Sequence, residues 1–246
     1  MDRLIYTAAS GAKHILEQQA TTSNNLANLS TTGFRAQLDT FRAVPVVSEG
    51  LPTRAFVVDN TVGADFTAGP LQVTGRDLDV AIKGQGWIAV QMQDGTEAYT
   101  RNGSLQVSPN GILQTANGQT VMGEGGPIAI PPNTTVSIGK DGSIASLTTD
   151  TVPATSTIVG RLKLVNPDQK QLVRGDDGLF RQQDGTPAQA DAAVTVTSGA
   201  LEGSNVSAVD SMVNMISLAR SLETQMSLLK NAENNAAKAT QILALT

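Results

Sequence analysis

The chain has 246 residues, of which 40% are hydrophobic and only 16% are charged, and its net charge is −5 at pH 7. It contains no cysteine and a single histidine, which excludes disulfides, thiolate metal sites and a zinc site built on several histidines. The acidic balance argues against binding to nucleic acids or other polyanions. No apolar run approaches the roughly 18 residues of a membrane span. Residues 1–6 have neither a basic n-region nor a long apolar h-region, so we expect no cleavable signal peptide.

The first predicted element is a helix over residues 2–29. Apolar and small side chains recur in alternating steps of three and four, which is the spacing of one helix face. These positions are Ile5, Ala8, Ala12, Ile15, Gln19, Thr22, Leu26 and Leu29. Gln19 and Thr22 dilute the stripe. Gly33 is a suitable stop, because glycine readily takes the left-handed conformation that follows a helix end.

The middle of the chain predicts β-structure. All 10 prolines and 21 of the 23 glycines lie between residues 45 and 203, and both residue types favour turns over helix. Asn-Gly or Asp-Gly dipeptides, which predict tight hairpin turns, end at Gly95, Gly103, Gly111, Gly118, Gly142, Gly178 and Gly185. Their spacing between residues 95 and 118 predicts a meander, and residues 78–82 and 158–165 read as strands. Residues 34–75 are less regular and predict a connector.

A second long helix is predicted from about Ser207 to residue 244. Two lines of a heptad pattern carry the prediction. One line is Met215, Leu222, Leu229, Ala236 and Leu243, and the intervening line is Met212, Ala219 and Met226. The run from Ser207 to Asp210 outlines a capping box, with Asp in place of the usual Glu.

Neither helix can bury its stripe alone. Each fully buried Leu, Ile or Met is worth roughly 1.5–3 kcal/mol, so each stripe needs a partner, either the other terminus or a neighbouring molecule. Alanine, threonine and glutamine within the stripes make one isolated pair marginal. The pattern therefore favours an assembly of many helices.

Three other features could suggest chemistry. Gly84 and Gly86 mimic part of a dinucleotide-binding fingerprint, but the residues that follow alternate like a strand, so a turn is favoured. His14 lies off the helical stripe and has neither a cysteine nor a second histidine to complete a catalytic group. Asp77 and Asp79 could form a carboxylate pair on one strand face. With an arginine beside them, solvated charges at a strand edge are the favoured interpretation.

Three asparagines near the end of the first helix, Asn24, Asn25 and Asn28, lower its helix propensity, because their side chains compete for backbone hydrogen bonds. They either bond across packed helices or mark a frayed helix end before Gly33. The residues alone leave both interpretations open.

Three stretches resemble signatures of the bacterial flagellar rod and hook proteins, in order along nearly the whole chain. They are residues 23–34 (SNNLANLSTTGF), residues 78–87 (LDVAIKGQGW) with 99–103 (YTRNG), and residues 199–206 (GALEGSNV) leading into MVNMI and RSLE. The opening MDRLIYTA and the compact length most resemble the proximal rod branch, because distal rod proteins are usually longer and hook proteins much longer. Ser221 departs from the pattern, since relatives often carry an aromatic residue there.

The resemblance implies a fold class: a mainly β central domain with long N- and C-terminal helices that pair as a coiled-coil-like bundle. It implies an N-terminal helix of the axial core over residues 1–33 and an extended connector over 34–75. The central β domain would cover residues 76–198, and the C-terminal heptad helix 199–246. The helices would line the inner tube of an axial structure, with the β domain outside.

The resemblance also implies a structural, non-enzymatic role in the periplasmic rod, the drive shaft of the flagellum. The partners would be neighbouring rod proteins, further copies of the chain and, in transit, the flagellar export apparatus, with no cofactor, nucleic acid or small-molecule substrate. It favours an interface role for the three asparagines. The expected assembly interface comprises Ile5, Ala8, Ala12, Ile15, Thr22, Asn24, Asn25, Leu26, Asn28, Leu29, Met212, Met215, Ala219, Leu222, Met226, Leu229, Ala236 and Leu243.

Three alternatives stay open at this point. The chain could be a distal rod paralogue. It could be a secreted β-domain adhesin or carbohydrate-binding module with oligomerising helices, for which Trp87 and Tyr99 are the candidate contact residues. It could also be a hydrolase that uses Asp77 and Asp79.

Overall fold

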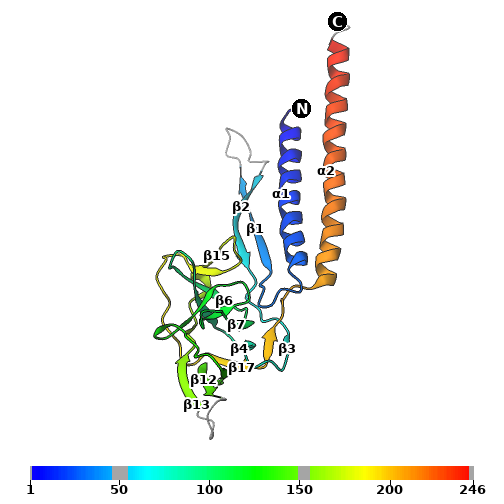
Figure 1. Ribbon diagram of the computed structural model, residues 1–246. Helices are drawn as coiled ribbons and strands as arrows, with labels where there is room; N and C mark the ends of the chain where they lie inside the picture. The colour runs from blue at the N-terminus through cyan, green and yellow to red at the C-terminus, as the bar shows by residue number, and fades with distance from the viewer. Residues whose placement is uncertain (1, 46–54, 149–155, 244–246) are drawn as a thin grey trace. The chain divides into compact units, whose positions relative to one another are not determined.

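The computed structural model describes residues 2–45, 55–148 and 156–243 (Figure 1). These residues form two compact units. The helical unit comprises the described parts of residues 1–28, 37–65 and 206–246. The β unit comprises the described parts of residues 29–36 and 66–205.

The helical unit contains helices α1 (Asp2–Ala27) and α2 (Ala208–Leu243), which pack against each other. It also contains an antiparallel pair of strands, β1 (Gln37–Pro45) and β2 (Ala55–Ala64), with an irregularity in register between Thr40 and Phe41. Both strands contact α1, so α1 lies between the strand pair and α2 (Figure 1). The helix pair and the mainly β middle confirm this part of the predicted fold class, while the coiled-coil character of the pair stays a prediction.

Both helices begin and end close to the predicted residues. Ser207 Oγ accepts a hydrogen bond from the Asp210 backbone N–H at 3.3 Å, as an N-cap residue does. Helix α1 ends at Ala27, two residues before the predicted end. There the Asn24 carbonyl accepts from both the backbone N–H and the side-chain amide of Asn28, at 3.1 and 2.9 Å.

Residues 34–75, for which the sequence predicted a connector, include β1, β2 and the short strand β3 (Leu71–Val73). Strands β1 and β2 carry β-branched and aromatic residues that suit a strand. They escaped prediction because no Asn-Gly or Asp-Gly dipeptide stands between them and the segment shows no regular turn spacing.

The β unit is built on a nine-stranded sheet with the order β15-β16-β6-β5-β9-β8-β7, in which β10 also pairs with β9 and β14 with β5. A three-stranded sheet, β11-β12-β13, and the pairs β17-β4 and β18-β3 complete it. The strands run β4 (Val80–Lys83), β5 (Trp87–Gln91), β6 (Glu97–Thr100), β7 (Leu105–Val107), β8 (Leu113–Thr115), β9 (Thr120–Gly123), β10 (Gly126–Pro127), β11 (Thr134–Ile138), β12 (Ser143–Thr148), β13 (Ser156–Arg161), β14 (Leu164–Val165), β15 (Leu172–Arg174), β16 (Phe180–Gln182), β17 (Thr195–Ser198) and β18 (Ala200–Glu202), with a 3-10 turn at Gln169–Gln171.

Most of the predicted hairpin turns are present. Six of the seven glycines have positive φ, at residues 95, 111, 118, 142, 178 and 185, and the first five of these join β5–β6, β7–β8, β8–β9, β11–β12 and β15–β16. The predicted meander is wrong, because β6 and β7 are not neighbours and β9 pairs with β5 instead. The chain leaves the sheet after β6, where the Gly103 carbonyl accepts from the Val80 N–H at 3.0 Å.

Gly103 is therefore a site of close backbone approach rather than a hairpin turn. A Cβ atom at this residue would lie 1.6 Å from the Val80 carbonyl oxygen. Gly33 meets a similar restriction. It has a φ of +69°, and a Cβ there would lie 2.3 Å from the Arg101 carbonyl carbon.

The core of the β unit is aliphatic, with Val80, Ile88, Val90, Leu105 and Leu113 among its fully buried side chains. Beside it, Trp87 packs on Phe180 and Phe66, with ring centroids 4.7 and 5.9 Å apart. The single tryptophan of the chain therefore reports on folding of the β unit.

The Gly103→Ala substitution tests the close approach at Gly103. Because a Cβ has no space beside the Val80 carbonyl, we expect the backbone to shift and the free energy of unfolding to fall by about 3 kcal/mol. Urea unfolding followed by Trp87 fluorescence measures this loss. Gly125→Ala is the matched control, because nothing lies within 4 Å of a Cβ at Gly125, and it should unfold like the unmodified chain. Equal midpoints for the two variants would contradict the proposed clash.

Candidate functional site

The face of α2 that is shielded within the helical unit follows a heptad pattern. Its buried and half-buried residues, spaced by three and four, are Ser211, Met215, Leu218, Leu222, Gln225, Leu229 and Ala232. On α1, Ala8 and Ala12 are buried, and between them a Cβ at Gly11 would lie 3.5 Å from the Gln225 side chain. Small residues on α1 therefore allow the two helices to approach closely.

The two predicted heptad lines of α2 lie in different environments. Met215, Leu222 and Leu229 are half-buried on the shielded face, whereas Met212 and Met226 are 53% and 56% exposed and Ala219 is half-buried. The shielded companion line is Ser211, Leu218, Gln225 and Ala232, which sequence reasoning missed because serine and glutamine do not register as apolar. The side chains of Ala236 and Leu243 lie outside the described residues.

The predicted residues of α1 are mostly shielded. Ile5, Ile15, Thr22 and Leu26 are half-buried, and Ile5 lines a shallow pocket with Met226 and Leu229 of α2. Leu29 is exposed and belongs to the β unit.

The first half of α2 also carries an exposed apolar patch, which we call the outer patch: Val209, Met212, Val213 and Ile216, each more than half exposed. Beside it Ser221, the residue that departs from the rod and hook pattern, helps to line a hollow with Val213, Ile216 and Arg220. A helix that is apolar on nearly every side is typically buried. The outer patch therefore indicates a surface that another molecule covers.

The three asparagines have intramolecular partners. Asn25 donates its side-chain amide to the Gln37 carbonyl at 2.9 Å and accepts from the Gln37 N–H at 2.8 Å, so it pairs with β1 as a neighbouring strand would. Asn28 bonds back to Asn24 within the end of α1. Among the described contacts, these side chains bind β1 and the helix end rather than α2.

Another side of α1 also binds β1. Thr21 donates to Asp39 at 2.8 Å. The His14 ring packs edge-on against Phe41, with centroids 5.6 Å apart, and lies 3.0 Å from Glu17. The single histidine therefore has a packing role.

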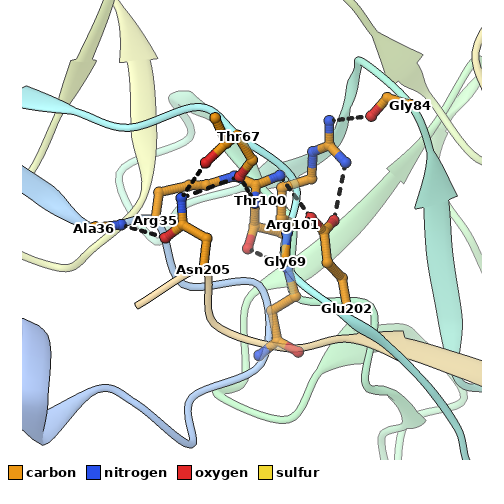
Figure 2. Close-up of polar contacts among 10 residues, drawn as sticks. Arg35, Ala36, Thr67, Gly69, Gly84, Thr100, Arg101, Glu202 and Asn205 are labelled. Atoms are coloured by element: carbon orange, nitrogen blue, oxygen red, sulfur yellow. Dashed lines mark hydrogen bonds and ion pairs between the residues drawn. The ribbon is translucent and has the colours of Figure 1, made fainter. Parts of the chain in front are cut away.

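The β unit holds a buried ion cluster around Glu202, which is 1% exposed (Figure 2). Glu202 Oε1 lies 2.7 Å from Arg35 Nη2 and accepts from the Gly69 N–H at 3.0 Å. Glu202 Oε2 accepts from Arg101 Nη1 at 2.9 Å. Burying a carboxylate is unfavourable unless it is paired and hydrogen-bonded, and here each oxygen meets both conditions.

The two guanidinium groups extend this cluster to further backbone oxygens. Arg35 donates from Nη1 to the Thr67 carbonyl at 2.6 Å, and Arg101 donates from Nη2 to the Gly84 carbonyl at 2.7 Å. The turn that mimicked a nucleotide fingerprint therefore supplies an acceptor for Arg101. Burial lowers the pKa of Arg101 below its ordinary value, an effect that Glu202 opposes and Arg35 reinforces.

Asn205 binds the same segments from the other side (Figure 2). Its Oδ1 accepts from the Ala36 N–H at 2.7 Å, and its Nδ2 donates to the Thr67 carbonyl at 3.1 Å. Its backbone N–H donates to the Phe34 carbonyl at 3.4 Å. The three stretches that carry the family resemblance thus meet in one place, through residues 32–34, 84 and 101–102, and 202–205, and residues 35 and 36 directly follow the first stretch.

The residues that supported other functions are engaged elsewhere. Asp79 is buried and lies 3.4 Å from Arg76, which corrects the expectation of a solvated charge, while Asp77 is exposed. Trp87 and Tyr99 are 3% and 1% exposed, so they offer no adhesive surface. Among the described residues, no cluster of three His, Cys, Asp or Glu could hold a metal ion, and no helix there is long and apolar enough to cross a bilayer.

Comparison with protein families finds matches in three regions of the chain. The family described as "Flagella basal body rod protein" matches residues 5–35, "Flagellar hook protein FlgE/F/G D1 domain" matches residues 81–146, and "Flagellar basal body rod FlgEFG protein C-terminal" matches residues 197–242. The chain is 49% identical to the flagellar basal-body rod protein FlgF of Escherichia coli K12 over the full length of both chains. This chain belongs to the FlgF family of flagellar basal-body rod proteins. FlgF of Salmonella typhimurium LT2 is 47% identical, also over both full lengths, and FlgF of Caulobacter vibrioides is 34% identical over 94% of each chain.

Tyr99 predicts a pH dependence of stability. Burial raises its pKa from 10.0 to about 12, although its hydroxyl accepts a hydrogen bond from the Ala188 N–H at 2.8 Å. The folded chain therefore holds this proton more tightly than the unfolded chain. The stabilisation is complete below pH 10 and should be lost between pH 10 and about 12, by up to about 3 kcal/mol.

Urea unfolding of a Tyr6→Phe variant, which leaves Tyr99 as the single tyrosine, measures this slope, and phenolate absorbance follows the titration directly. Adding Tyr99→Phe should remove the part of the pH dependence of unfolding free energy that Tyr99 contributes. It should also lower stability at neutral pH by about 1–3 kcal/mol, because the Ala188 N–H loses its acceptor. A phenol that titrates near pH 10 in the folded chain would refute the prediction.

Proposed function

We propose that this chain is a structural subunit of the proximal rod in the flagellar basal body, and that it assembles through its helices with further copies and with neighbouring axial proteins. The observation that carries the proposal is the outer patch of α2 in a member of the FlgF family. Four large apolar side chains stay in water in the single chain. Full burial of such a side chain is worth roughly 1.5–3 kcal/mol, and more than half of each one is still exposed.

The heptad pattern supports a bundle rather than an isolated pair. Met215, Leu222 and Leu229 lie on the shielded face of α2, while Met212 and Met226 remain exposed for a second partner. Apolar side chains that continue beyond the shielded face suit a helix with more than one neighbour. We therefore retain the assembly role for the predicted interface residues and place the contacts between molecules mainly on the outer patch.

The proposed role is mechanical and not enzymatic. Asp79, one of the two carboxylates that could have suggested hydrolysis, is buried beside Arg76. In the periplasmic rod, the subunit would form part of the shaft that connects the basal body to the outer axial parts. We further propose that it reaches the rod through the flagellar export apparatus.

Ile216→Asp tests the assembly role. Ile216 is 57% exposed in the single chain, so the substitution should leave the free energy of unfolding within about 0.5 kcal/mol of the original value. In a rod wall the new carboxylate would be buried without a partner, at a cost of several kcal/mol in every copy. We expect cells with this variant to export the protein but to lack complete rods and motility.

Asn231→Asp is the matched control, because it adds the same charge at an exposed residue of α2 outside the outer patch, and it should leave motility intact. Leu222→Asp serves as a comparison. It should also disturb the pairing of α1 with α2 within a single chain, since Leu222 lies on the shielded face. Normal rods built from the Ile216→Asp variant would exclude the outer patch as an assembly surface.

A further inference from the structure

We infer that Arg35, Arg101, Glu202 and Asn205 form a clamp that holds together the segments through which the β unit continues into the helical unit, and that this clamp positions α1 and α2 for pairing. The clamp consists of residues of the β unit alone. Its importance for the rod rests on the proposed function, whereas its effect on helix pairing is a property of the single chain.

Chain connectivity gives the clamp its place. The chain passes between the two units at residues 28/29, 36/37, 65/66 and 205/206. Residues 29–36 carry the first two of these passages, residues 66–69 follow the third, and residues 202–205 precede the fourth. Every passage therefore lies within a few residues of a clamp residue or of one of its bonded partners.

Asn205 joins these three segments through one side chain and its own backbone. Its Oδ1 holds the Ala36 N–H, its Nδ2 holds the Thr67 carbonyl, and its N–H bonds the Phe34 carbonyl. An amide can do this because it has donors and acceptors on one short, planar group. Aspartate has the same size but has no donor for Thr67.

Glu202 joins the same three segments, mainly through ion pairs. Oε1 of Glu202 forms an ion pair with Arg35, in residues 29–36, and accepts a hydrogen bond from the Gly69 N–H, in residues 66–69. The backbone carbonyl of Glu202 accepts from the Gly33 N–H at 2.8 Å. Oε2 receives Arg101, which fixes the clamp to the end of β6. These bonds are directional, so they set the mutual positions of the segments as well as holding them together.

Packing alone does not require this chemistry. A buried ion cluster often contributes no more stability than apolar side chains of similar volume. The clamp instead holds together the four segments that follow α1, precede β1, follow β2 and precede α2. If these segments separate, the end of α1 and the start of α2 are no longer held near each other. The two helices, whose contact is only weakly apolar, would then pair less often.

Disulfide trapping across the helix pair tests the clamp. The chain has no cysteine, and Gly11 and Gln225 are neighbours with room for a Cβ, so Gly11→Cys/Gln225→Cys provides a background-free reporter of helix pairing. In the purified monomer, oxidation should form this disulfide readily. Adding Asn205→Asp should slow its formation about tenfold, because the Thr67 carbonyl loses one of its two donors and faces a carboxylate.

Asn117→Asp is the matched control, since it makes the same change at an exposed turn of the β unit, and it should leave the rate unchanged. Trp87 fluorescence checks that the β unit remains folded in both variants. An equal trapping rate with Asp and Asn at residue 205, or failure of the parent pair to form the disulfide, would overturn the inference. Because the assay uses monomers, its result is independent of whether the Ile216→Asp variant builds rods.

A second variant tests whether the charges of the clamp position the helices or only stabilise the β unit. Arg35→Met/Arg101→Met/Glu202→Leu replaces the ion cluster with apolar side chains. We expect the urea midpoint of the β unit to approach that of the original chain while disulfide trapping stays about tenfold slower. Recovery of both properties would show that any well-packed contact suffices and would refute a positioning role for the charges.

Discussion

A carboxylate removed from water is the constraint on which the β unit depends. The two oxygens of the Glu202 carboxylate are bound by two guanidinium groups and a backbone amide that come from three separate parts of the chain. Removing one partner would leave a buried charge unpaired. The fold must therefore bring residues 35, 69, 101 and 202 together, and the N-terminal segment cannot leave the β unit without exposing that charge.

The helical unit depends on close packing of small side chains and not on a buried charge. Its helices approach closely where α1 is small, at Ala8, Gly11 and Ala12, and the shielded face of α2 includes Ser211 and Gln225. These small and polar residues limit what the contact between the helices gains from burial, while Val209, Met212, Val213 and Ile216 of α2 remain exposed to water. The single chain thus buries an apolar core in its β unit and leaves apolar side chains of α2 exposed in its helical unit.

Periodicity and turn chemistry predicted much of this fold. The seven-residue spacing located α2, and positive-φ glycines closed five of the predicted hairpins, because both signals are local. The register of the sheet is not local, so the pairing of β9 with β5 could not be read from turn spacing. The same limit hid the bond between Asn25 and Gln37 and the burial of Asp79. Each depends on a segment distant in sequence or on a strand without a recognisable turn.

The stretches that identified the family gain a physical explanation from the clamp. Gly33 and Gly103 leave space for backbone where a Cβ would collide, Arg35 and Arg101 compensate one carboxylate, and Asn205 supplies a donor and an acceptor at once. A junction made of such residues is recognisable in sequence because its chemistry allows few substitutes. The helix surfaces require only apolar character at the right spacing.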